Sequence, residues 1–222
     1  MEKISWDYMK NKMEKFSWNY IKGDTYFKLV DILEDKSLPD LEKSVKLVSV
    51  IAEIPTDEIY NMTMEDTGKL FCQLRFLNSF ELIPNYNPKY IKLPSFKIKI
   101  MKDVTNMTVS QYIDYQQFVL LPLREGYDKL LSIFLIPEGC KYNDGYDIVE
   151  LQKEIREGLS WREVQTLLNF FMKRYLESIL HTLKSFNQAM LKEKNPERQI
   201  QMKTNRDKLI DEITAISTLG YV

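Results

Sequence analysis

Glycine, histidine and cysteine are scarce in this sequence, and each scarcity argues against a class of function. Seven glycines among 222 residues are few for an all-β domain with many tight turns, and few for a glycine-rich loop that binds phosphate. The single histidine, His181, has no cysteine, serine or carboxylate at a catalytic spacing, which favours a structural role. The two cysteines, Cys72 and Cys140, fit no metal-ligand spacing and indicate free thiols in a reducing, cytoplasmic setting.

Net charge and long apolar runs are also lacking. Lysine and arginine total 31 against 32 for aspartate and glutamate, so no overall positive field attracts nucleic acid or an anionic membrane. No apolar run approaches the roughly 18 residues that indicate a membrane span, and the N-terminus lacks the layout of a signal peptide. Motifs for nucleotides, dinucleotides and catalytic zinc are not found. We therefore expect a non-enzymatic protein with no catalytic residue, no cofactor and no metal.

The sequence contains the signals of a mainly α fold with a small β-hairpin. Apolar residues recur at helical spacing, and Asp24 is expected to cap the first helix. We predict helices at 24–36, 39–55, 56–60, 63–77, 109–120, 127–136 and 148–156, then a helix of about thirty residues from 160 and a polar helix after 196. The inner face of the 109–120 helix is expected to include Tyr112, Ile113, Tyr115 and Val119.

Local signals mark several helix starts and one hairpin. Pairs with capping-box spacing occur at Thr63 and Asp66, at Thr108 and Gln111, and at Ser160 and Glu163. Apolar residues alternate with lysines over 96–102, which predicts a half-buried strand paired with 90–93. The last helix has only a sparse apolar stripe, formed by Ile200, Leu209, Ile213 and Ile216.

The N-terminus contains a duplicated motif. Residues 1–11 read MEKISWDYMKN and residues 13–23 read MEKFSWNYIKG, which repeats the pattern after a spacer of one residue. Two copies this short do not make a solenoid. One interpretation is a tandem duplication whose first copy is an extension, and the other is an aromatic arm that binds a partner. The candidate partner-binding residues of this arm are Trp6, Tyr8, Trp18 and Tyr20.

Charged residues form two further patterns. Lys92, Lys97, Lys99 and Lys102 make the best basic patch, with Phe96 among them. They favour either a surface for single-stranded nucleic acid or the protection of a sheet edge. Acidic and basic residues alternate over 150–157 in the pattern of a solvated helix face. Asp144 and Asp147 flank Gly145 and indicate a turn with a helix cap rather than a calcium loop.

The order of several short segments carries a family resemblance. In chain order they are LVSVIA at 47–52, TDEIY at 56–60, the lysine-rich hairpin, MTVSQYID at 107–114, IPEG at 136–139 and YNDGYD at 142–147, before the long helix. From Asp24 to about Phe186 this order resembles the small tail-assembly-chaperone-like and tail or neck proteins of bacteriophages that infect gut Bacteroidetes, including crAss-like phages. The resemblance implies a morphogenesis protein and supplies no catalytic residue.

Three regions and three functional hypotheses follow. The regions are an aromatic arm at 1–23, a helical domain with the hairpin at 24–193 and a C-terminal helical extension at 194–222. The first hypothesis is a multi-copy structural protein of the virion, in a portal-proximal ring of the tail or neck, which forms a homo-oligomer and contacts phage tail, portal or neck proteins without a membrane. The alternatives are a transient tail assembly chaperone of the host cytoplasm and a nucleic-acid-binding accessory protein that uses the Lys92–Lys102 hairpin.

Overall fold

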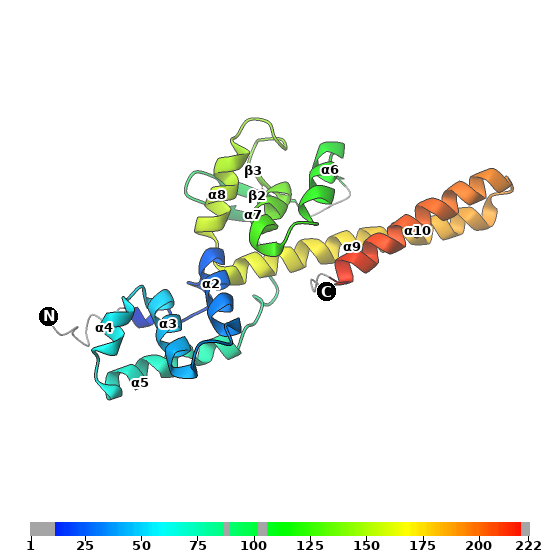
Figure 1. Ribbon diagram of the computed structural model, residues 1–222. Coiled ribbons are helices and arrows are strands. Elements are labelled where there is room, and N and C mark those ends of the chain that lie inside the picture. Colours follow the sequence, from blue (N-terminus) through cyan, green and yellow to red (C-terminus); the bar gives the residue numbers. More distant parts are fainter. Residues whose placement is uncertain (1–11, 87–88, 102–105, 219–222) are drawn as a thin grey trace.

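The computed structural model describes residues 12–86, 89–101 and 106–218, and it confirms a mainly helical fold with a small sheet and a long C-terminal helix (Figure 1). The N-terminal helices are α2 (Gly23–Glu34), α3 (Asp40–Ala52), α4 (Thr56–Tyr60), α5 (Met64–Gln73) and the 3-10 helix η1 (Leu74–Asn78). The later helices are α6 (Val109–Phe118), α7 (Leu123–Phe134), α8 (Ile148–Gly158), α9 (Trp161–Lys192) and α10 (Pro196–Thr218).

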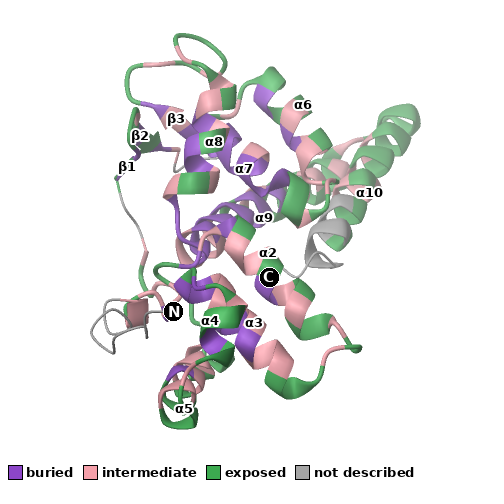
Figure 2. Cartoon of the chain, turned by 60° about the vertical axis from the view of Figure 1, so that its left-hand side comes forward, coloured by how far each residue is buried: buried purple, intermediate pink, exposed green. Residues whose placement is uncertain are grey.

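Two groups of elements lie on either side of the first half of α9. Helices α2 to α5 form one group, and α6 to α8 with the sheet form the other (Figure 1). The N-terminal half of α9 is buried, including Trp161, Val164, Leu167 and Phe171. Figure 2 shows the buried residues gathered where α7, α8 and α9 meet, while α10 is mostly exposed.

Aromatic stacking fixes α9 to both groups. The Trp161 ring stacks on Tyr26 of α2, with ring centroids 4.2 Å apart. Ten residues further along α9, the Phe171 ring stacks on Phe134 of α7, with ring centroids 4.4 Å apart. Large aromatic side chains contribute much of the apolar area buried in a core. The first half of α9 is therefore the central element of the fold, and its second half leaves the core.

The sheet has three antiparallel strands, one more than the predicted hairpin. Strand β1 (Tyr90–Lys92) pairs with β2 (Lys97–Ile100), which pairs with β3 (Leu135–Pro137). Residues 135 and 136 were predicted to continue a helix. That prediction was wrong because a continuous apolar run has no period that separates a buried helix from a buried strand. Helix α7 also begins earlier than predicted, with Pro122 at its N-cap.

The capping boxes at Thr108 and Ser160 are confirmed. Each side chain accepts a hydrogen bond from the backbone three residues on, and each partner side chain bonds back to the cap backbone. Asp147 caps α8 as expected. Asp24 does not cap α2, because Lys22 holds the N-cap position and Asp24 lies in the first turn. There its carboxylate pairs with Arg156 instead.

The predicted inner face of α6 was partly wrong. Tyr115 is buried, but Tyr112 and Ile113 are exposed. Gln111 takes the inner position, where its Nε2 donates to the Ile133 carbonyl oxygen at 2.9 Å while its Oε1 accepts from the Thr108 amide. The amide side chain thus ties the start of α6 to α7, and both ends of this buried polar group are hydrogen-bonded.

His181 is exposed on the outer half of α9. The expectation of a solvated face over 150–157 was wrong at two positions. Glu154 is buried and its two carboxylate oxygens accept hydrogen bonds from the Ser95 amide at 3.0 and 3.1 Å. Arg156 pairs with the buried carboxylate of Asp128. Two charged residues of α8 therefore bind neighbouring elements rather than water.

Candidate protein-binding surfaces

Within residues 12–86, 89–101 and 106–218, no three His, Cys, Asp or Glu side chains are placed to hold a metal ion. Cys72 and Cys140 are both free thiols. The same part of the chain contains no helix that is long and apolar enough to span a bilayer.

The second copy of the duplicated motif packs against the helical body. We use the name Trp18 groove for the residues that Lys15, Trp18 and Asn19 contact there, which are Tyr26, Glu53, Phe76, Phe80 and Arg162. The Trp18 indole Nε1 donates to the Phe76 carbonyl oxygen at 2.9 Å. Its ring contacts the rings of Phe76 and Phe80 edge-on, with centroids 5.3 and 5.0 Å apart. Trp18 thus anchors its own chain in this structure.

Charged contacts hold the same segment at both ends of the groove. Lys15 Nζ lies 2.5 Å from a carboxylate oxygen of Glu53, and Arg162 Nη1 donates to Asn19 Oδ1 at 3.3 Å. A cavity of 310 Å³ borders Trp18 and Arg162. Of the four candidate partner-binding residues, Tyr20 is exposed, and Trp6 and Tyr8 lie outside the described residues.

The candidate basic residues share the solvent face of the sheet. Lys92, Lys97 and Lys99 are exposed, and Lys102 lies outside the described residues. Lys97 Nζ is 2.6 Å from Glu138 and also lies over the Tyr90 ring. The hydrogen bond that Lys97 donates to the Glu138 carboxylate raises the pKa of Lys97. Glu138 offsets one charge of this small patch. Lys97 and Lys99 lie on β2, the central strand of the sheet, so the prediction that they protect a sheet edge was wrong; of the three described lysines, Lys92 of β1 alone lies on an edge strand.

The largest exposed element is a hairpin of two helices. The outer half of α9 and the whole of α10 run side by side away from the body, joined by a short turn (Figure 1). Leu183 of α9 and Leu209 of α10 pack toward the core cluster at the base of the hairpin. Further out, each helix has only the other to cover it, so apolar side chains remain exposed.

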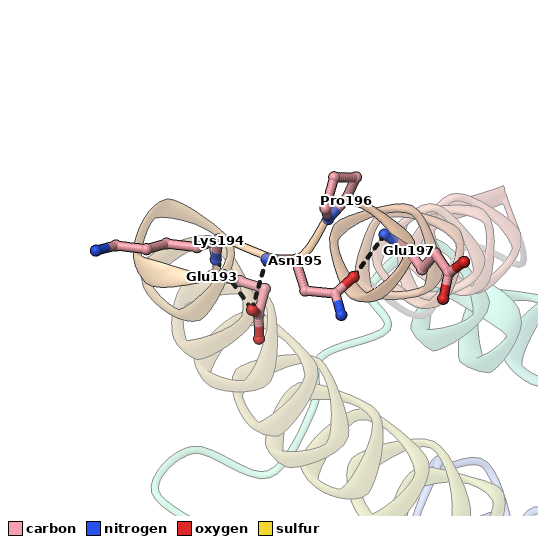
Figure 3. A pocket seen from close by; sticks show the side chains of 5 residues that line it. All are labelled: Glu193, Lys194, Asn195, Pro196 and Glu197. Atoms are coloured by element: carbon pink, nitrogen blue, oxygen red, sulfur yellow. Dashed lines mark hydrogen bonds between the residues drawn. The ribbon is translucent and has the colours of Figure 1, made fainter.

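The turn of the hairpin satisfies its own backbone groups. Glu193 Oε1 accepts from the amides of Lys194 and Asn195, both at 2.9 Å, and Asn195 Oδ1 accepts from the Glu197 amide at 2.9 Å (Figure 3). Asn195 thereby caps α10, and Pro196 occupies its first position, where a missing amide hydrogen costs nothing. The five turn residues enclose a shallow depression of 820 Å³.

One face of the hairpin combines exposed apolar residues from both helices. Leu180 and Leu191 are eleven positions apart on α9, so they differ by only about 20° around the helix. A groove of 460 Å³ beside Leu191 is lined by Asn187, Met190, Leu191, Gln199 and Lys203. Ile210 follows Lys203 by seven positions and so lies on the same side of α10. We call Leu180, Leu191 and Ile210 the hairpin face; all three are exposed.

Comparison with known proteins finds no matching family model, no matching curated protein and no matching solved structure. The candidate surfaces therefore rest on the residues of this chain alone.

Sequence reasoning placed the basic residues on a strand and found the duplicated motif, but it missed the hairpin face. The available signal was the sparse apolar stripe of the last helix. That stripe includes Leu209, which packs inward, and it omits Leu180, Leu191 and Ile210. Only the way in which α10 folds back along α9 decides which leucines remain uncovered.

Proposed function

We propose that this chain is a non-enzymatic structural protein that assembles with further copies of itself, and that the hairpin face is the contact between copies. The observation that supports this is the exposure of Leu191, whose side chain is 88% exposed near the end of the hairpin. A two-helix hairpin cannot bury such residues by itself, whereas four packed helices can.

The occupant of the hairpin face is a second hairpin in the antiparallel orientation. Leu180 and Ile210 lie near the base, and Leu191 lies about 16 Å further along α9 at 1.5 Å per residue. A two-fold axis between two hairpins brings the base of each against the end of the other. The Leu180 and Ile210 of one copy then cover the Leu191 of its partner, and the reverse contact forms at the same time.

The biological setting proposed is the tail or neck of a bacteriophage virion. Its support is the order of sequence segments between Asp24 and Phe186, which resembles phage tail-assembly-chaperone-like and neck proteins. The two-fold contact between hairpin faces closes into a dimer, so in a ring or tube of the tail or neck each dimer joins the next through a second, different contact. In this setting the partners are phage tail, portal or neck proteins, and the chain is present in the mature virion.

The contact is tested by the mass of the protein in solution. Light scattering over a concentration series should give a multiple of the chain mass for the unmodified protein, and a smaller mass for Leu191→Glu. Leu120→Glu is the matched control, because Leu120 is 79% exposed on the body, far along the chain from the hairpin. An unmodified protein that stays monomeric at every concentration, or a Leu120→Glu change as large as that of Leu191→Glu, contradicts the proposal.

The setting is tested separately by mass spectrometry of purified phage particles. Peptides of this chain should be found in particles at a stoichiometry of many copies. Detection in infected cells but not in particles would instead support the assembly-chaperone alternative.

A further inference from the structure

The chain has one Trp18 groove but two copies of the motif that fills it. We propose that Lys3–Tyr8 of the same chain is a second peptide ligand of this groove and can replace Lys15–Tyr20 there. The groove is thus a binding site for a peptide of the pattern Lys-apolar-Ser-Trp-Asn/Asp-Tyr. This inference does not depend on the proposed function.

The contacts that hold the second copy use side chains that the first copy repeats. Lys15 pairs with Glu53, and Lys3 occupies the equivalent position in the first copy. Trp18 donates its indole hydrogen to the Phe76 carbonyl oxygen and packs on the rings around it. Trp6 is the equivalent residue and carries the same donor and the same ring. The ion pair and the aromatic anchor can therefore both be formed by either copy.

The two differences within the segment act in opposite directions. Ile4 stands where Phe16 is buried against the edge of Phe76, so the first copy loses an aromatic contact and some apolar area. Asp7 stands where Asn19 accepts a hydrogen bond from Arg162. A carboxylate in that position makes a charge-assisted bond to the guanidinium, which is stronger than a bond from a neutral amide. The first copy is therefore a comparable ligand: its apolar contact at Ile4 is weaker than that of Phe16, and its polar contact at Asp7 is stronger than that of Asn19.

In the proposed exchange, the residues from Ile21 onward keep their positions. The Ile21 carbonyl oxygen accepts from the Trp161 amide, and Lys22 Nζ donates to the Gly158 carbonyl oxygen at 2.6 Å. Gly23 follows, and a side chain there would collide with the Tyr127 ring, so Asn11 of the first copy cannot take that place. Ile21, Lys22 and Gly23 therefore stay, and residues 9–20 become a loop between Tyr8 and Ile21. Because loop closure becomes costlier only slowly with length, such a loop is tolerated.

The exchange leaves one motif outside the groove in either arrangement. With the second copy bound, the tryptophan outside the groove is Trp6, and with the first copy bound it is Trp18. Each tryptophan is followed two positions later by a tyrosine. The groove therefore decides which of two related aromatic segments remains for contact with another surface.

Three full-length variants test the replacement: Trp6→Ala, Trp18→Ala and the double variant. We expect Trp6→Ala to leave the melting temperature unchanged and Trp18→Ala to lower it by a few degrees, because Trp6 then fills the groove. The double variant should melt roughly 5 °C or more below Trp18→Ala, since a half-buried tryptophan is lost without replacement. A double variant with the same melting temperature as Trp18→Ala overturns the proposal.

Fluorine NMR of protein labelled with 5-fluorotryptophan gives a second readout. The sequence has three tryptophans, so single variants assign the signals. In Trp18→Ala, the Trp6 signal should move to the chemical shift that Trp18 has in the unmodified protein, with no change in mass by light scattering. A Trp6 signal that does not move overturns the proposal, and a rise in mass assigns the replacement to another copy and overturns the intramolecular form.

Discussion

Asp128 and Arg156 form a forked ion pair between α7 and α8, in which Nε and Nη2 of the guanidinium both lie 3.0 Å from Oδ2 of the carboxylate. The Asp128 side chain is only 8% exposed. Arg156 Nη1 also lies 3.0 Å from Asp24 of α2, and the guanidinium covers the Tyr127 ring. One arginine therefore joins three helices that come from both sides of α9.

Removal of the Asp128 charge should destabilise the protein more than removal of an exposed one. Asp128→Asn leaves Arg156 with a weakened partner in a partly buried place, and we expect a loss of about 2 kcal/mol in the free energy of unfolding. Asp31→Asn is the control, because the Arg124–Asp31 pair is half exposed on both sides and should cost less than about 1 kcal/mol. Urea denaturation measures both, and equal losses would contradict the structural role of the fork.

Tyr127→Phe should not weaken the fold. The Tyr127 hydroxyl is buried, and among the described residues it has no hydrogen-bond partner. A buried hydroxyl without a partner costs free energy, so its removal should leave the stability unchanged or raise it by up to about 1 kcal/mol. Thermal denaturation of the two proteins side by side checks this. Tyr142→Phe is the contrast, because Tyr142 donates to Asp114 at 2.7 Å, and its loss should be destabilising.

The protein should lose stability between about pH 10 and pH 12. Burial, with the nearby charge of Glu163 adding to it, raises the pKa of Tyr86 to about 12. Burial also raises the pKa of Tyr127 and, together with the Asp114 hydrogen bond, that of Tyr142. A folded-state pKa above the unfolded value of about 10 stabilises the protein below pH 10, and this contribution is lost as the pH rises through the folded pKa. Tyrosinate absorbance and circular dichroism during an alkaline titration should therefore show part of the tyrosines ionising only with unfolding.

Ser160→Ala should cost about 1 kcal/mol of stability by removing the cap of the central helix. The Ser160 hydroxyl accepts from the Glu163 amide at 3.3 Å and bonds the Glu163 carboxylate at 2.8 Å. Ser185→Ala is the matched control on the same helix, since Ser185 only bonds back to the His181 carbonyl oxygen on an exposed face. That change should be neutral or slightly stabilising in the same denaturation experiment.

Local sequence signals predicted much of the fold because they act over three or four residues. The boxes at Thr108 and Ser160 and the cap at Asp147 could be read directly, since each cap satisfies amides within its own helix. The alternation over 96–100 likewise placed β2. Strand β3 could not be read, because its apolar residues continue those of α7 without a change of period.

The candidate surfaces depended on contacts between distant segments, which no local pattern encodes. Glu154 and Arg156 have the spacing of a solvated face, yet Ser95 and Asp128 bind them. Trp18 has the composition of a partner anchor, but a carbonyl group 58 residues away in sequence receives its indole hydrogen. Leu191 becomes significant only once α10 lies beside α9 and leaves it uncovered.

Because α9 is one continuous helix, its buried half in the core and its exposed half in the hairpin tilt together. The last buried residue is Ile179 and the helix ends at Lys192, so its free arm extends about 20 Å at 1.5 Å per residue. Phe171, which stacks on Phe134, lies 21 residues before the end of α9 at Lys192, or about 32 Å at 1.5 Å per residue. A tilt of about 10° about this contact displaces the hairpin turn by about 5 to 6 Å, so a load applied at the hairpin is transmitted to the centre of the fold.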